Sequence, residues 1–348
     1  MTVRVGFFGA GRMALSHVMA LARVPDAELV AMCDVAPEQI ERVPGAVRQR
    51  TAAAGDAVEL SPPAAYSDPG RMLARERLDA VYICLPPAVR GDVELAVIEA
   101  GVPMLVEKPL ALDLSIARTV LAGVRRRQLM AASGYQYRYA TWAQRAVDEL
   151  SGHVVGQAIA TRFSRLPSST SWYRRQEMSG GQLVETVTHQ VDLLRLLAGE
   201  VRTVHAFGGI RAERTRAPED DIFDAQSVAL MFESGAVGTV ACNLLSPHGN
   251  RWQVHIACEG KDVLLLGNRL QVVDAGGERE WPMDDHDPLM AESAAFVRAV
   301  AEGRPDLVRS TYESGVRTLA VTIAADRSER LGVPVDVAAL IQEEVGLD

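Results

Sequence analysis

Residues 3–14 read VRVGFFGAGRMA, and this stretch decides the fold of the first half of the chain. Apolar residues alternate as in a β-strand, a G-x-G-x-x-A turn follows, and a helical pattern runs over 12–24. Gly9 allows the tight turn, Gly11 lets the backbone approach a pyrophosphate, and Ala14 lets the helix pack closely on the strand. The N–H groups at the helix N-terminus then point at the phosphates. The stretch predicts a dinucleotide-binding strand–turn–helix unit.

An acidic residue follows the turn at the distance where a ribose would lie. Asp34 ends the apolar run 28–33, about 20 residues past the turn, where a carboxylate can accept hydrogen bonds from both ribose hydroxyls of NAD. It would repel a 2′-phosphate at a cost of roughly several kcal/mol. The alternative is a glycine-containing turn with a helix-capping acid nearby. We expect NAD, with NADP less favoured, and cofactor contacts from Gly9, Gly11, Arg12, Met13 and Asp34.

Length and charge restrict the class of protein. The chain has 348 residues, enough for two domains that each bury a core. Its formal net charge of −9, without a stripe of Lys and Arg, argues against nucleic-acid binding. No apolar stretch approaches the ~20 residues that span a bilayer, no export signal is visible, and the four cysteines form no C-x-x-C pair. We expect a cytoplasmic protein with no membrane or nucleic-acid partner.

The first half alternates strand-like and helical segments. This alternation predicts a parallel sheet covered by helices, that is, an NAD-binding Rossmann α/β domain over residues 1–135. Pro44-Gly45 and Ser61-Pro62-Pro63 are expected to break the long second crossover into a helix and an exposed loop. The strand-like runs lie at 3–8, 29–33, 80–85, 104–106 and 130–134.

After about Tyr139 the pattern changes to alternating apolar and polar residues with turns between the runs. It predicts an α+β domain over residues 136–348, with an open, mainly antiparallel sheet, for substrate binding and oligomerisation. One strong helix is expected over 181–198, with helices over 288–302 and 312–331 closing this half. The expected strands lie at 157–165, 203–211, 225–232, 236–243, 252–259, 261–265 and 269–273.

A Glu-Lys-Pro tripeptide at 107–109 follows the strand-like run 104–106. Ligands of a parallel sheet bind at the carboxyl ends of its strands, so Lys108 would stand beside the nicotinamide. There it could exchange a proton or donate a hydrogen bond to a substrate hydroxyl. The alternative is a surface lysine in a strand–loop corner. We expect further cofactor contacts from Leu85, Pro86, Glu107 and Lys108.

A second cluster, GGQLVETVTHQVD, occupies residues 180–192. Glu185 and His189 are four residues apart, so they share one face of a helix, and Asp192 continues that face. The rest of the helix is apolar, so this polar stripe needs partners or a cleft. A histidine between two acids indicates an active site. The alternative is a structural histidine in the core whose ring nitrogens are hydrogen-bonded there. No second His or Cys lies at ligand spacing, so we expect no metal.

Together these motifs resemble the glucose–fructose oxidoreductase/inositol dehydrogenase/MocA (Gfo/Idh/MocA) family over nearly the whole chain. The resemblance implies reversible NAD(P)-linked oxidation of a secondary hydroxyl on a sugar, polyol or related compound. It gives Lys108 and His189 the proton-handling roles and makes Asp192 a substrate-binding or orienting residue. It also implies an open-sheet domain whose sheet face often forms subunit interfaces. Because an exposed sheet face needs covering, we expect a homodimer or homotetramer.

The chain departs from the family pattern at three positions. Glu185 stands where an Asp is common, Val187 where a Gly is common, and Arg90 where the loop after the fourth strand often has a His. Glu185 keeps the charge and can still orient His189. Beyond the motifs, aromatic and arginine side chains before the helix and at the crossover between the halves are candidates for sugar binding, or else for a capping loop. These candidates are Trp172, Arg174, Tyr137 and Arg138.

We therefore expect an NAD(P)-dependent dehydrogenase in which His189, oriented by Glu185, removes the hydroxyl proton while Lys108 hydrogen-bonds the same oxygen. Two alternatives keep the fold. One is an enzyme that retains NAD and cleaves a glycoside through transient oxidation, so that reduced cofactor does not accumulate. The other is a catalytically retired NAD-binding regulatory protein, which would bind NAD without turnover.

Overall fold

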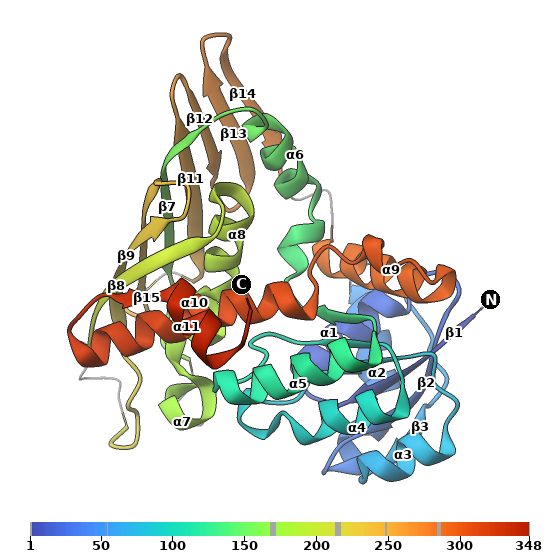
Figure 1. Ribbon diagram of the computed structural model, residues 1–348. Helices are drawn as coiled ribbons and strands as arrows, with labels where there is room; N and C mark the ends of the chain where they lie inside the picture. The colour runs from blue at the N-terminus through green and yellow to red at the C-terminus, as the bar shows by residue number, and fades with distance from the viewer. Residues whose placement is uncertain are drawn as a thin grey trace. The chain divides into compact units, whose positions relative to one another are not determined.

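The computed structural model describes residues 2–53, 55–167, 172–212, 217–247, 249–283 and 287–347 (Figure 1). The chain divides into two units, and it passes between them more than once. The first unit comprises Met1–Leu110, Thr119–Tyr139 and Asp287–Ser314. The second comprises Ala111–Arg118, Ala140–His286 and Gly315–Asp348.

The first unit is built on a six-stranded parallel sheet with strand order β3-β2-β1-β4-β5-β6. This confirms the expected Rossmann architecture, in which strand order reverses between β1 and β4 and opens a crevice at their carboxyl ends. The short strand β3 was not predicted. The strands are β1 (Val3–Phe8), β2 (Ala27–Cys33), β3 (Ala64–Tyr66), β4 (Ala80–Ile83), β5 (Met104–Val106) and β6 (Ala131–Ser133).

The helices of this unit lie between these strands, directly after β6, and in the distant segment 287–314. They are α1 (Arg12–Leu21), α2 (Pro37–Ala53), α3 (Pro69–Arg75), η1 (Pro87–Val89), α4 (Asp92–Ala100), α5 (Leu114–Arg127), η2 (Gln136–Tyr139), α9 (Pro288–Glu302) and η6 (Pro305–Leu307).

Two expectations about these helices are wrong. Helix α2 continues through Pro44, because its buried face of Ile40, Val43 and Val47 packs into the core and outweighs the local cost of the proline. Helix α9, expected in the second half, contacts α1 and β1 and adds Phe296 to the core of the first unit. The apolar periodicity of α9 predicted a helix, but it did not indicate in which of the two cores the helix would pack.

The second unit contains a nine-stranded sheet with order β14-β13-β12-β11-β7-β10-β9-β8-β15. Every neighbouring pair is antiparallel except β7 and β10, which confirms the expected open, mainly antiparallel sheet. Strands β14 and β15 were not predicted. The strands are β7 (Val155–Phe163), β8 (Val201–Gly209), β9 (Ala225–Phe232), β10 (Val237–Asn243), β11 (Arg251–Cys258), β12 (Lys261–Leu265), β13 (Arg269–Asp274), β14 (Gly277–Pro282) and β15 (Val335–Asp336).

Helices of this unit contact one face of the sheet, with α8 against β7 and β11, and α6 against β12 and β13. The opposite face carries apolar side chains that are exposed, among them Phe163, Phe207, Met231 and Val237. None of the helices in the described part of the chain is both long and apolar enough to cross a bilayer. The helices are α6 (Thr141–Leu150), η3 (Trp172–Arg174), α7 (Gln176–Ser179), the π-helical η4 (Leu183–Val187), α8 (Thr188–Ala198), α10 (Tyr312–Leu331) and α11 (Val337–Glu344).

Candidate active site

The glycine turn between β1 and α1 is shaped to receive a phosphate. Gly9 has φ +97°, and a Cβ there would lie 2.7 Å from the carbonyl oxygen of Cys84, so both backbone and space require glycine. A Cβ at Gly11 would meet no atom within 4 Å, so the backbone there is open to an approaching group. Gly11 is also the N-cap of α1 and makes no side-chain cap to the N–H groups of the first turn. This arrangement fits the pyrophosphate of a dinucleotide.

Asp34 is fixed beside that turn. Its Oδ2 accepts the N–H of Ala10 at 2.7 Å, and its Oδ1 accepts the N–H of Ala36 at 2.9 Å. A carboxylate oxygen can accept a second hydrogen bond, so both oxygens of this half-buried group can still receive ribose hydroxyls. The remaining residues predicted to touch the cofactor here are Arg12 and Pro86, both exposed, and Met13 and Leu85, both half-buried. Their cofactor contacts stay predictions.

Arg90 holds together the loops that follow β4 and β5. Its buried guanidinium donates to the carbonyl oxygens of Leu85 and Pro109, each at 2.7 Å, and to that of Glu107. These bonds fix the main chain on both sides of Lys108, whose peptide bond to Pro109 is cis. Where the family often has a His, this chain therefore has a cation that binds backbone carbonyls.

Glu107 is buried and pairs with a histidine that the sequence reasoning missed. Its Oε1 lies 2.7 Å from Nε2 of His17, and its Oε2 accepts the N–H of Lys108 at 3.0 Å. Burial alone would raise the pKa of Glu107, but His17, Lys108 and Arg90 together hold it below its ordinary value. The carboxylate is thus ionised at neutral pH. His17 lies 90 residues away on the helix of the glycine turn, so no local pattern joins the two.

The Gly180-Gly181 pair precedes the helix that was predicted over 181–198. Both glycines have positive φ, +73° and +77°, and a Cβ at Gly180 would lie 2.9 Å from the Cβ of Val184. The helix ends at 198 as predicted, but its early part is the π-helical η4. Glu185 lies in this π-turn and His189 is the second residue of α8. Single π-turns occur frequently at functional sites.

The hydroxyl of Thr186 anchors the carboxylate of Glu185, and the hydroxyl of Tyr173 in turn holds that of Thr186. The Thr186 hydroxyl donates to Glu185 Oε2 at 2.8 Å, and the Tyr173 hydroxyl lies 2.5 Å from Thr186 Oγ1. Since the single proton of Thr186 goes to Glu185, Tyr173 is the donor to Thr186. Burial, and then the nearby Glu185 carboxylate, raises the pKa of Tyr173, which keeps it a neutral donor. The role of Glu185 in orienting the half-buried His189 stays a prediction.

Asp192 is buried in the second unit. Its Oδ1 accepts the hydroxyl of Thr318 at 2.8 Å and lies 3.9 Å from Nη1 of Arg195. Arg195 is itself paired with Glu200 at 2.6 Å. Asp192 thus joins α8 to α10, and its contact with substrate stays a prediction. Within the described ranges no three His, Cys, Asp or Glu side chains gather as a metal site would need.

The other predicted substrate-binding residues lie in different surroundings. Arg174 is buried, donating from Nη1 to Asp220 at 2.6 Å and from Nε to the carbonyl of Pro167 at 2.8 Å. Trp172 is 39 % exposed. On η2 of the first unit, Tyr137 is half-buried and Arg138 is buried. Their substrate contacts stay predictions.

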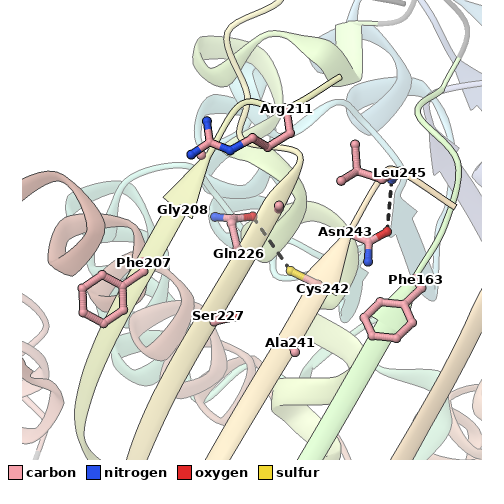
Figure 2. A pocket seen from close by; sticks show the side chains of 12 residues that line it. Phe163, Phe207, Gly208, Arg211, Gln226, Ser227, Ala241, Cys242, Asn243 and Leu245 are labelled. Atoms are coloured by element: carbon pink, nitrogen blue, oxygen red, sulfur yellow. Dashed lines mark hydrogen bonds between the residues drawn. The ribbon is translucent and has the colours of Figure 1, made fainter. Parts of the chain in front are cut away.

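A cavity of about 390 Å³ lies at the ends of β7, β8, β9 and β10 (Figure 2). Figure 2 shows Cys242 beside Gln226, whose Oε1 is 3.9 Å from the sulfur. None of the residues predicted for the site lines this cavity, so it is separate from the candidate catalytic groups. It is lined by Phe163, Phe207, Gly208, Gly209, Arg211, Ala225, Gln226, Ser227, Ala241, Cys242, Asn243 and Leu245.

Comparison with protein families gives matches in both halves of the chain. Residues 3–135 match the model described as an oxidoreductase family with an NAD-binding Rossmann fold, and residues 142–262 match the GFO/IDH/MocA C-terminal domain. The myo-inositol 2-dehydrogenase of Thermotoga maritima is 22% identical over 336 residues, covering 94% of this chain and 96% of the relative. The NAD⁺-dependent scyllo-inositol 2-dehydrogenase of Bacillus subtilis is 26% identical, covering 96% of each chain.

Solved structures share the fold at lower identity. A levoglucosan dehydrogenase in complex with NADH has a TM-score of 0.82 at 20% identity, covering 97% of this chain and 99% of that one. An oxidoreductase from Agrobacterium radiobacter, in complex with NAD⁺, L-tartaric acid and magnesium, also has a TM-score of 0.82, at 18% identity and covering 98% and 100%.

Proposed function

Because this chain belongs to the Gfo/Idh/MocA oxidoreductase family and has its NAD-binding Rossmann domain, we propose that it oxidises a secondary hydroxyl of a sugar, polyol or related compound, or reduces the ketone. When bound, NAD supplies the acceptor or donor of hydride. The observation that carries the proposal is the open glycine turn with Asp34 fixed beside it, joined in one chain to the Glu-Lys-Pro loop. We favour a sugar or polyol because the relatives named above act on inositols.

The chemical roles follow from what each group can do. His189 removes the proton of the substrate hydroxyl during oxidation, and Glu185 orients its ring. Lys108 donates a hydrogen bond to the same substrate oxygen and relays the proton. Two observations support these assignments: the Glu185 carboxylate is held by the hydroxyl of Thr186, which Tyr173 holds in turn, and the main chain around Lys108 is fixed on both sides.

Binding of the substrate's other hydroxyls is assigned to the remaining polar and aromatic candidates. An exposed indole such as that of Trp172 offers a flat apolar surface for a sugar ring. The further candidates are Tyr137, Arg138, Arg174 and Asp192. Binding of NAD is assigned to residues 1–135, and binding of substrate to 136–348.

We also propose that the protein is a homodimer or homotetramer in which a second copy covers the open sheet face. That face exposes Phe163, Phe207, Met231 and Val237, and apolar side chains gathered on one face often mark a surface that a second chain covers. Light scattering during gel filtration measures the mass directly. The change Met231→Asp places a charge on this face and should yield monomers, whereas a wild-type protein that elutes as a monomer would refute the assembly.

The proposed reaction is tested by incubating the protein with NAD⁺ and a panel of polyols and sugars, and following the absorbance of reduced nicotinamide. Accumulation with one class of substrate, lost in Lys108→Ala, supports the proposal. The matched control is Lys261→Ala, since Lys261 is the one other lysine of the chain and pairs with Glu149 in the second unit. Cleavage of glycosides without reduced cofactor would support transient oxidation instead, and NAD binding without turnover on the whole panel would support a regulatory protein.

A further inference from the structure

His17 is a buried histidine for which the proposed reaction gives no role. It lies in α1, the helix that starts at the glycine turn, and its side chain is fully buried. Its ring lies 5.3 Å from that of Tyr82, which stacks on Phe7 at 4.7 Å, so the imidazole borders an aromatic part of the core. A buried polar ring is costly unless it is hydrogen-bonded. Within the described residues its one hydrogen-bond partner is Glu107, because Nδ1 is buried and has none.

The carboxylate of Glu107 divides its two oxygens between His17 and Lys108. Oε1 receives the imidazole Nε2–H at 2.7 Å, and Oε2 receives the backbone N–H of Lys108 at 3.0 Å. A Cβ on Gly134 would lie 3.0 Å from Oε1 and 3.1 Å from the carboxyl carbon, so Gly134 packs directly on the carboxylate. The carboxylate is therefore held between the imidazole, the peptide N–H and the glycine.

Arg90 also holds the main chain of this loop. It binds the carbonyl oxygens of Glu107 and Pro109, the residues on either side of Lys108. The N–H of Lys108 is thus held by the Glu107 carboxylate, and the carbonyl groups on either side of Lys108 are held by the Arg90 guanidinium.

We propose that His17 is a positioning residue, which acts through Glu107 to fix the loop of Lys108 relative to the helix that begins at the glycine turn. The inference rests on the role given to Lys108 in the proposed function. Its physical basis is that a displacement of about 1 Å at a reacting group can lower the rate about 100-fold. Without the imidazole, Glu107 loses its partner on Oε1 and can rotate away from the N–H of Lys108.

Three variants separate positioning from packing. His17→Leu fills a similar volume without a donor, His17→Gln restores an N–H donor, and Tyr82→Phe changes the same core but leaves the imidazole–carboxylate pair. We expect His17→Leu to lower kcat by about 10- to 100-fold, with KM for NAD⁺ changed by less than about threefold. His17→Gln should recover most of kcat, and Tyr82→Phe should stay within about twofold of the wild type.

A second measurement does not depend on turnover. Hydrogen exchange by mass spectrometry reads the backbone N–H of residues 104–110, and acetylation compares the amine of Lys108 with that of Lys261 as an internal reference. In His17→Leu the hydrogen exchange of residues 104–110 should accelerate about 10-fold or more, and the ratio of Lys108 acetylation to Lys261 acetylation should differ from that of the wild type.

The outcomes are distinct. Exchange and kcat in His17→Leu that equal those of Tyr82→Phe would overturn the positioning role. If the wild type turns over no substrate, the proposed function fails, while exchange and acetylation still decide whether His17 fixes the Lys108 loop.

Discussion

Replacement of Glu329 by glutamine should change how the stability of the second unit depends on pH. Glu329 lies on α10, and both of its carboxyl oxygens accept from Nε2 of Gln226 at 2.9 Å. Burial, supported by the charge of Asp326, raises the pKa of Glu329 from 4.5 to about 7, although Gln226 and Arg330 act in the opposite direction. The folded protein thus keeps this carboxyl protonated at pH values where the unfolded chain has lost the proton.

This difference in pKa between the folded and unfolded states determines the sign and size of the pH effect on the free energy of unfolding. Between pH 4.5 and about 7 the unfolded state binds fewer protons at this site than the folded state, so the free energy of unfolding falls as the pH rises. At about 1.4 kcal/mol for each pH unit, the full difference is about 3 kcal/mol. Glutamine has the shape of the protonated acid and does not ionise. We expect Glu329→Gln to equal the wild type near pH 4.5 and to exceed its stability by up to about 3 kcal/mol at pH 8.

Urea unfolding at a series of pH values, followed by tryptophan fluorescence, measures this difference. The control is Glu343→Gln, an exposed glutamate of α11 whose replacement should leave the pH dependence unchanged. A stability difference for Glu329→Gln that is the same at all pH values, or that favours the wild type at pH 8, would refute the reasoning. Fluorescence reports on the second unit because it contains all four tryptophans, Trp142, Trp172, Trp252 and Trp281.

Three further predictions concern the cofactor and the reaction. Gly11→Ala should leave thermal stability unchanged and weaken NAD binding, measured by calorimetry, about 10-fold or more. Gly9→Ala should also lower the free energy of unfolding by about 1–3 kcal/mol, because the new Cβ meets the carbonyl oxygen of Cys84. Equal stability of the two variants would contradict this expectation. Asp34→Asn should reduce the preference for NAD over NADP, measured as a ratio of kcat/KM, by about 10- to 150-fold, since it removes a charged acceptor; an unchanged ratio would exclude Asp34 from the selection. His189→Ala should lower kcat by about 10²- to 10⁴-fold with NAD affinity retained, and near-native turnover would remove His189 from the mechanism.

Much of the fold could be predicted because local pattern and tertiary structure agree. The turn around Gly9 required glycine for its positive φ, and the strands apolar on both faces belong to a buried parallel sheet, as their composition indicated. Strand β14 was missed because half of its residues are charged and most are exposed at a sheet edge, without the alternation that marks a half-buried strand.

The π-turn at 183–187 shows a limit of helical periodicity. A π-turn adds one residue to a turn, and over five residues the apolar pattern is compatible with either helix. The sequence therefore predicted the helix and a shared face for Glu185 and His189. It did not predict the Thr186 hydroxyl that holds the carboxylate, or the Tyr173 hydroxyl that donates to Thr186.

Long-range pairs were the part of the site that sequence could not supply. His17 and Glu107 are 90 residues apart, and Arg174 and Asp220 are 46 apart. A histidine on an apolar helix face has no visible partner in the sequence, and the residues around Arg174 in the sequence do not indicate which carboxylate it pairs with. Only the folded structure shows these two pairs.

Transfer of an isotope label tests the central claim most directly. A polyol carrying deuterium on the carbon that is oxidised is incubated with the protein and NAD⁺, and the nicotinamide is then analysed by mass spectrometry. The account predicts deuterium in the reduced cofactor, and its loss when Lys108 is replaced by alanine. Binding of NAD without deuterium in the nicotinamide, across deuterated inositols and sugars, would contradict it.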